Sequence, residues 1–90
     1  MTMTSDQRVQ LHPQVVDTDL DGDELALLHL ETKTYYSLNA TGRRIWNGLK
    51  QQLSLSEISS RLQEEFQVDA QTADVSVIRL LHDLQQLVVV

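Results

Sequence analysis

Apolar residues fall in short runs in the first half of the chain and recur at helical spacing in the second half. The short runs lie at about 14–18, at 25–30 and at 35–38, and turn-forming or polar residues bound each of them. Asp21-Gly22 separates the first two runs, and Gly accepts the positive φ that a tight turn needs. The pattern predicts three strands in an antiparallel meander, with the 35–38 strand at one edge.

Three helices are predicted after the strands. Asn39 is placed to cap the first helix, because its side chain can accept a backbone N–H of the first turn. Ser54 and Glu57 match a capping box for the second helix. Asp69 is placed to cap a third helix over about 70–87. The apolar face of this third helix is predicted to comprise Val77, Ile78, Leu81, Leu84 and Val88.

Three strands followed by three helices predict an α+β fold. The helical trio with an attached sheet is typical of a winged helix-turn-helix-like arrangement, although here the sheet comes first. Residues 1–8 are polar and lack periodicity, so we interpret them as a flexible tail. The remaining residues, 9–90, are expected to form a single domain, because a chain of 90 residues has no room for a second core.

The charge balance argues against binding to nucleic acid or to anionic membranes. Seven basic residues face 13 acidic residues, which gives a formal net charge of -6. The largest basic cluster is Arg43-Arg44 with Lys50, too small for several phosphate contacts. An acidic winged-helix DNA-binding regulator is therefore only an alternative. No apolar run reaches the roughly 18–20 residues of a membrane span, and the first residues do not resemble a secretory signal, so a cytoplasmic location is expected.

Residues for catalysis or for a cofactor are not found in a recognisable pattern. The chain has no Cys, and its three histidines, His12, His29 and His82, are not paired by spacing with any nucleophile. We interpret His29 and His82 as ordinary, partly exposed side chains. We therefore expect no enzyme activity and no cofactor.

The acidic segment 17–24 resembles the first half of a calcium loop. Asp17, Asp19 and Asp21 alternate before Gly22, as in an EF-hand, but the twelfth position is Leu28 where the loop needs a bidentate Glu. The flanks also read as strands. We interpret the segment as a solvated acidic hairpin turn and expect no metal site.

The edge of the 35–38 strand is a possible docking site for another strand. Residues 34–37 contain no Pro, and Lys33 is the one charge nearby, whereas exposed edges are usually blunted by such residues. Alternation places Tyr36 with Leu38 on one face and Tyr35 with Ser37 on the other. The alternative is that the two tyrosines only cover the core.

Residues 27–46 resemble the PqqD family, whose members are small peptide-recognition proteins of ribosomal-peptide natural-product pathways. The resemblance rests on residues 36–42 (YSLNATG), which are followed by Ile45-Trp46. Weaker agreement extends it to about residues 14–90. The chain departs from the family pattern at Lys33, where Gly is frequent, and at residues 87–90, where the family often has Gly-Leu.

The resemblance implies that the chain is a noncatalytic adaptor, a recognition element for the leader segment of a precursor peptide. In such domains the leader adds as a strand to the third strand and packs against the third helix. Carried onto this sequence, the implied binding residues are Lys33, Thr34, Tyr35, Tyr36, Ser37 and Leu38 on the strand side, and Asp74, Val75, Ile78, Leu81 and His82 on the helix side. The opposite border of the helix, with Leu80 and Leu87, stays open.

The implied partners are the precursor peptide and a maturation enzyme. In lasso-peptide pathways that enzyme is a transglutaminase-like cysteine protease that removes the leader. The sequence of residues 35–42 slightly favours this group, by resemblance. In the synthesis of pyrroloquinoline quinone it is a radical-SAM enzyme, which is the alternative. In both cases the adaptor acts by proximity, holding the peptide near an active site.

Overall fold

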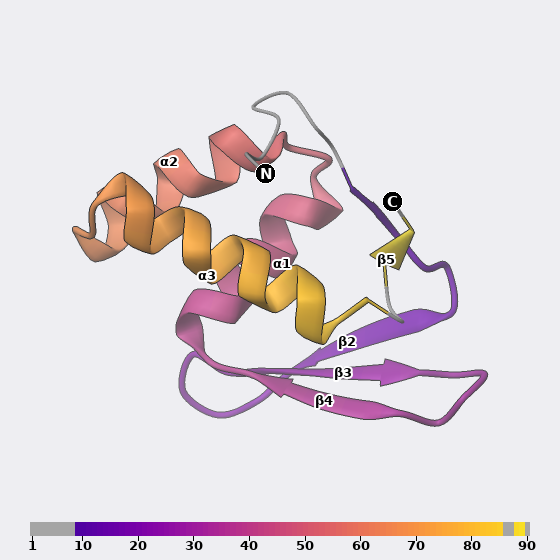
Figure 1. Cartoon of the computed structure of the whole chain (residues 1–90). Coiled ribbons are helices and arrows are strands. Elements are labelled where there is room, and N and C mark those ends of the chain that lie inside the picture. The colour runs from indigo at the N-terminus through magenta and orange to yellow at the C-terminus, as the bar shows by residue number, and fades with distance from the viewer. Residues whose placement is uncertain (1–8, 86–87, 90) are drawn as a thin grey trace.

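The three predicted strands form one antiparallel sheet. The computed structural model describes residues 9–85 and 88–89, and β2 (Val15–Asp19), β3 (Leu25–His29) and β4 (Tyr35–Leu38) lie in the order β2-β3-β4 (Figure 1). Gly22 has a φ of 76° in the β2–β3 turn, as that turn requires. In the β3–β4 turn Lys33 has a φ of 62°, a left-handed conformation that Gly adopts at lower cost. The predicted meander is therefore confirmed.

The three predicted helices are confirmed together with their caps. They are α1 (Ala40–Lys50), α2 (Leu55–Phe66) and α3 (Ala70–Asp83). The Gly42 N–H donates to Asn39 Oδ1 at 2.9 Å, and the Thr72 N–H donates to Asp69 Oδ1 at 2.8 Å. Both halves of the capping box at the start of α2 are present. These contacts satisfy N–H groups that have no partner inside a helix.

The core lies between one face of the sheet and the helices, with α1 and α3 nearer the sheet and α2 packed on their far side (Figure 1). Alternate residues of β3 and β4 point into it, and Leu27 is completely buried. At Gly48, a Cβ atom would lie 2.7 Å from Ile58 Cγ1, so Gly is what allows α1 to approach α2 this closely. The main buried apolar residues are Leu25, Leu27, Leu38, Ile45, Trp46, Leu49, Ile58, Leu62, Ala73, Val77 and Leu84.

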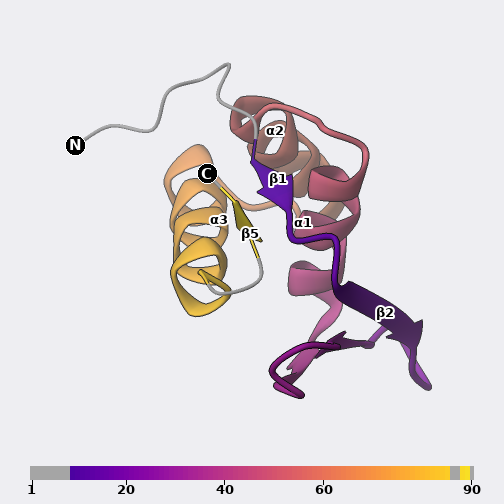
Figure 2. The ribbon, with the colours of Figure 1, turned by 90° about the vertical axis from the view of Figure 1, so that its right-hand side faces the viewer.

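The third helix is shorter than predicted. It ends at Asp83 and not near residue 87. Val88, which was placed on the face of this helix, belongs to β5 (Val88–Val89), which pairs antiparallel with β1 (Gln10–Leu11) (Figure 2). The placement of Val88 on a helix face was therefore wrong. A run of β-branched residues favours a strand once a partner strand is at hand. The predicted tail 1–8 and Leu87 lie outside the described residues.

Two side chains have a different environment from the one predicted. Ile78 was expected on the apolar face of α3, but it is 49% exposed, because the core-facing line of this helix runs through Ala73, Val77 and Leu84. His29 was expected to be partly exposed, but it is buried at the end of β3. There its ring lies 4.5 Å from that of His12 between centroids, and its Nδ1 accepts the Thr32 N–H at 3.3 Å.

Within the described residues, none of the helices combines the length and the apolar character that crossing a bilayer would need.

Candidate functional site

The outer edge of β4 presents backbone groups that no strand of the described residues pairs with. The His29 N–H donates to the Thr34 carbonyl at 2.9 Å, which fixes the hydrogen-bonding phase of the β3–β4 ladder. Hydrogen-bonded and non-hydrogen-bonded pairs alternate along an antiparallel ladder. Tyr36 and Leu38 therefore bond to β3, whereas Tyr35 and Ser37 direct their N–H and C=O groups away from it. An added strand would meet these two donors and two acceptors.

The side chains of β4 divide between the two faces of the sheet as predicted. Leu38 is buried and Tyr36 is half-buried against the core, while Tyr35 is 62% exposed and Ser37 is exposed on the opposite face. The two tyrosines thus have different roles, because only Tyr36 covers the core.

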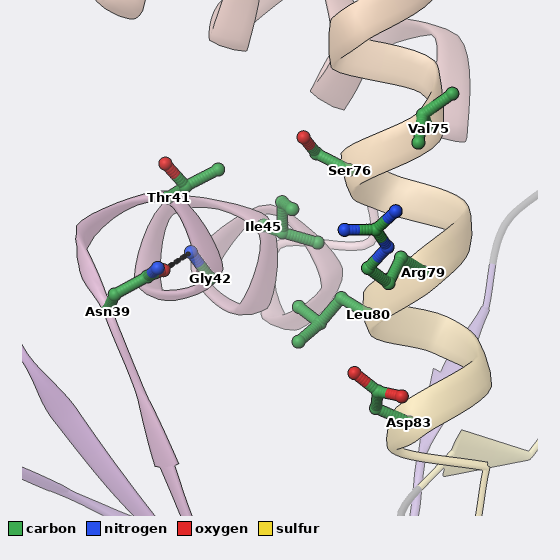
Figure 3. A pocket seen from close by; sticks show the side chains of 9 residues that line it. All are labelled: Asn39, Thr41, Gly42, Ile45, Val75, Ser76, Arg79, Leu80 and Asp83. Atoms are coloured by element: carbon green, nitrogen blue, oxygen red, sulfur yellow. Dashed lines mark hydrogen bonds between the residues drawn. The ribbon is translucent and has the colours of Figure 1, made fainter.

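A groove lies between β4 and α3, beside this edge. One hollow of about 380 Å³ is lined by β4 residues and by the last turn of α3. A second, of about 270 Å³, is lined by the start of α1 and the middle of α3 (Figure 3). Asn39, Gly42, Leu80 and Asp83 line both hollows, so the two adjoin. We name the pair the β4–α3 groove.

Residues of α3 reach the groove from one border of the helix. Figure 3 shows Ser76, Leu80 and Asp83 on the side of α3 that faces α1, with Arg79 beside them. Leu80 was left open in the sequence as part of the alternative border, and it is this border that lines the groove. Sequence reasoning missed Ser76, Arg79 and Asp83, although the spacing 76, 80 and 83 marks a continuous helix face.

Of the helix residues expected to bind a peptide, Val75 alone lines the groove. Asp74 faces α2 instead, where its Oδ1 accepts the Ser59 hydroxyl at 2.5 Å. Leu81 is half-buried against the core, and Ile78 and His82 are exposed without lining either hollow. The structure therefore does not bring these four residues together with the β4 edge.

Gly42 allows α1 to lie close to the end of β4, at the inner side of the groove. At Gly42, in the first turn of α1, a Cβ atom would lie 3.2 Å from Leu38 Cβ. A larger residue there would press α1 away from the end of β4. Gly42 belongs to the YSLNATG segment. The close approach of its backbone to Leu38 is a structural reason for a Gly at this position of the segment.

The acidic hairpin that precedes β3 is bound to α1. Arg43 pairs with Asp19 at 2.6 Å, and Arg44 pairs with Asp23 at 2.8 Å and with Glu65 of α2. The Arg44 guanidinium, as a hydrogen-bond donor, lowers the pKa of Asp23 below its ordinary value. The hairpin is exposed, as predicted, but its carboxylates also hold the sheet to the helices.

Asp17 extends these ion pairs toward the core. Its Oδ2 accepts from Lys50 Nζ at 2.8 Å and from the indole N–H of buried Trp46 at 2.9 Å. Hydrogen bonding to Lys50 and then to Trp46 holds the pKa of Asp17 below its ordinary value, against the opposing effect of burial.

These contacts also bear on metal and nucleic-acid binding. Among the described residues, no group of three or more His, Asp or Glu side chains is placed to hold a metal ion. The Arg43, Arg44 and Lys50 cluster, which was the main basic patch in the sequence, is paired with carboxylates of the same chain. Paired in this way, it offers few charges for phosphate contacts.

A family model and solved structures both match this chain. The model of the family described as coenzyme PQQ synthesis protein D (PqqD) matches residues 24–90. A structure of TbiB1 in complex with the TbiA(beta) leader peptide is 34% identical, with a TM-score of 0.80, covering 88% of this chain and 93% of that one. A structure of lasso peptide synthetase B1 complexed with the leader peptide shares the fold, with a TM-score of 0.83 at 21% identity, covering 93% of this chain and 100% of that one. No significant match is found among curated proteins.

Proposed function

Because the chain belongs to the PqqD family, we propose that it is a noncatalytic adaptor that binds the leader segment of a ribosomally made precursor peptide. The leader adds as a strand to the free edge of β4 and lays side chains into the β4–α3 groove. The observation that carries the proposal is the edge at Tyr35 and Ser37, which no strand of the described residues pairs with, and the open groove beside it. The 34% identical TbiB1, whose structure contains a leader peptide, supports it.

Strand addition gives the binding energy in this mechanism. The two outward-facing residues supply two donors and two acceptors, and each backbone hydrogen bond contributes about 0.5–1.5 kcal/mol net. The groove adds apolar contact through the exposed Val75 and the half-buried Leu80. Both sources are independent of net charge, so an acidic body is compatible with peptide binding.

The helix side of the proposed site is the border that lines the groove. We place the leader against Val75, Ser76, Arg79, Leu80 and Asp83, which line it. The strand side comprises residues 33–38, with backbone contacts at Tyr35 and Ser37.

The partner enzyme in this proposal is the leader protease of a lasso-peptide pathway. The adaptor holds the leader, the protease holds the adaptor, and the cleavage site is presented at raised effective concentration. No bond chemistry is assigned to the adaptor itself. The likeness to lasso peptide synthetase B1 supports this choice at the level of the fold.

A titration followed by NMR tests the binding site. The leader of the precursor peptide encoded beside this chain is added to 15N-labelled protein, and amide shifts are recorded. We expect the largest shifts at 33–38 and along the groove-lining border of α3. Shifts that miss both segments would contradict the site, and a leader without measurable affinity would contradict the function.

Reconstitution tests the partner. Precursor peptide is incubated with the transglutaminase-like protease of the same gene cluster, with and without this chain. Leader cleavage should be faster when the chain is present. An equal cleavage rate in both samples would refute the assignment to a protease, and acceleration of a radical-SAM enzyme in a parallel assay would assign the alternative pathway.

A further inference from the structure

Arg79 is the one basic side chain among the residues that line the β4–α3 groove. It extends from α3 into the space between that helix and α1 (Figure 3). It is exposed, and within residues 9–85 and 88–89 it forms none of the ion pairs identified. Arg43 and Arg44 differ, since both are paired with carboxylates. The guanidinium of Arg79 is therefore available to a bound molecule.

The neighbouring carboxylate does not neutralise Arg79. Asp83 lies four residues further along α3, within reach for a helix pair, but the two are not ion-paired in the described structure. A basic residue placed N-terminal to an acidic one is the less favourable order for such a pair, because the helix dipole opposes it. Both charges thus stay exposed to the groove.

The two hollows of the groove differ in charge. The hollow beside α1 contains Arg79 and Asp83, whereas the hollow beside β4 contains Asp83 and Glu24 but no basic residue. A carboxylate on a bound peptide is attracted where it meets the Arg79 guanidinium in the first hollow, and it finds only carboxylates as charged groups in the second. One position along the peptide is therefore favoured over its neighbours.

Backbone pairing alone does not provide this selection. A strand that slips by two residues makes the same hydrogen bonds to Tyr35 and Ser37 and keeps the same faces. The register of an added strand has to come from side chains, through pockets or charges. In this groove the one attractive charge for an acidic side chain is Arg79.

We propose that Arg79 pairs with a carboxylate side chain of the leader, and that this pair sets the register of the added strand. The ligand class is thus a leader segment with an Asp or Glu that reaches the hollow beside α1. The acidic pair of Glu24 and Asp83 disfavours registers that place this carboxylate near β4. The inference rests on the proposed function and names a specificity-determining residue for it.

A double-mutant cycle tests the pair. The leader of the neighbouring precursor and variants with one Glu→Gln or Asp→Asn change each are titrated by calorimetry into wild type and Arg79→Gln. The matched control is Arg61→Gln, an exposed arginine of α2 that lies outside the groove. An exposed ion pair is worth up to about 1 kcal/mol, which corresponds to roughly a fivefold loss of affinity.

We expect Arg79→Gln to weaken binding roughly three- to fivefold and Arg61→Gln to leave it unchanged. One amide variant of the leader should lose the same factor with wild type and lose nothing further with Arg79→Gln. Added salt should remove the difference, because exposed pairs are screened.

Three results would overturn the inference. They are equal affinities of the two arginine variants, losses that add for every leader variant, and a binding leader without any carboxylate. If Tyr35 and Ser37 amides still shift with the leader in these cases, the proposed function stands and this inference alone fails. A leader that does not bind wild type overturns both.

Discussion

The two edges of the three-stranded sheet are protected very differently. Pro13 precedes β2, the strand at one edge. Two carboxylates of β2 are ion-paired, Asp17 with Lys50 and Asp19 with Arg43. The β4 edge has no Pro and no charged residue within the strand. Proline and charge are the usual means of blocking edge-to-edge pairing. The β2 edge is thus attached to the helices, whereas the β4 edge has no such attachment and no pairing strand within residues 9–85 and 88–89.

Substitutions at the two edges should therefore have different consequences for the stability of the fold. Side chains of β2 form ion pairs and a hydrogen bond that join the sheet to α1, so changes there alter stability. The outward N–H and C=O groups of β4 support nothing else in the described structure. Changes there should alter binding and leave the fold in place.

The largest expected effect comes from breaking the β2 attachment. Asp17→Ala removes the acceptor of the buried Trp46 indole N–H, and an unsatisfied buried donor costs about 2 kcal/mol. The free energy of unfolding in urea should fall by about that amount, while leader affinity measured below the transition stays within about twofold. Asp21→Ala is the control, since Asp21 is exposed in the same hairpin and forms no ion pair in the described structure. Equal losses of stability in the two variants would contradict this role of Asp17.

The next effect comes from closing the β4 edge. Ser37→Pro removes an outward N–H and places a ring on the edge, so leader affinity should fall at least about tenfold. Ser37→Ala, which keeps the N–H, should bind within about twofold of wild type. Unfolding transitions of the two variants should differ by less than 1 kcal/mol, because the lost N–H is not part of the β3–β4 ladder. A proline variant that binds as well as the alanine variant would exclude strand addition at Ser37.

The carboxylates that attach the β2 edge and its hairpin should make the stability of the fold depend on pH. The pKa of Asp17 is lowered by hydrogen bonding to Lys50 and Trp46, and that of Asp23 by Arg44, so both carboxylates bind protons less readily in the folded chain than in the unfolded one. Their stabilisation is complete above the unfolded pKa, near 3.8, and is lost as the pH falls through the lower folded values. We expect thermal stability to decline below about pH 4, and less steeply in Asp17→Asn. An identical pH profile for this variant would contradict the assignment.

The smallest effect concerns the turn that leads into β4. Lys33 has a φ of 62°, which costs a non-Gly residue about 1 kcal/mol or more, partly offset by the greater chain entropy of Gly when unfolded. Lys33→Gly should therefore raise the free energy of unfolding by about 0.5 kcal/mol. Lys33→Ala serves as the control and should not be stabilising. A destabilised Gly variant would show that the lysine side chain contributes more than its backbone strain costs.

Much of the fold follows from signals that lie within a few residues of each other. The turn at Gly22, the caps at Asn39 and Asp69, and the capping box at Ser54 were all predicted and are all present, since each forms within four residues. The alternation in β4 likewise placed Tyr36 against the core and Tyr35 outside it. The identity of the edge strand is therefore encoded in local sequence.

The helix side of the candidate site depended on packing instead. A helical wheel shows two polar-apolar borders of α3, and local sequence does not say which border faces β4. The packing of α3 against α1 and α2 decides this, because it turns Leu80 and Arg79 toward the groove and Asp74 toward Ser59. The burial of His29 has the same origin, since the ring of His12 reaches it from outside β3.

The order of the elements, their caps, the acidic balance and the exposed strand follow from the amino-acid sequence, because they depend on local propensity and spacing. Only the tertiary structure decided where α3 ends, which of its borders faces β4, and which charges are paired. Val88–Val89 becomes a strand because Gln10–Leu11 lies beside it. Arg43 and Arg44 are paired with the acidic hairpin, whereas Arg79 forms no ion pair within residues 9–85 and 88–89. These features depend on contacts between residues far apart in the chain, so local sequence patterns do not predict them.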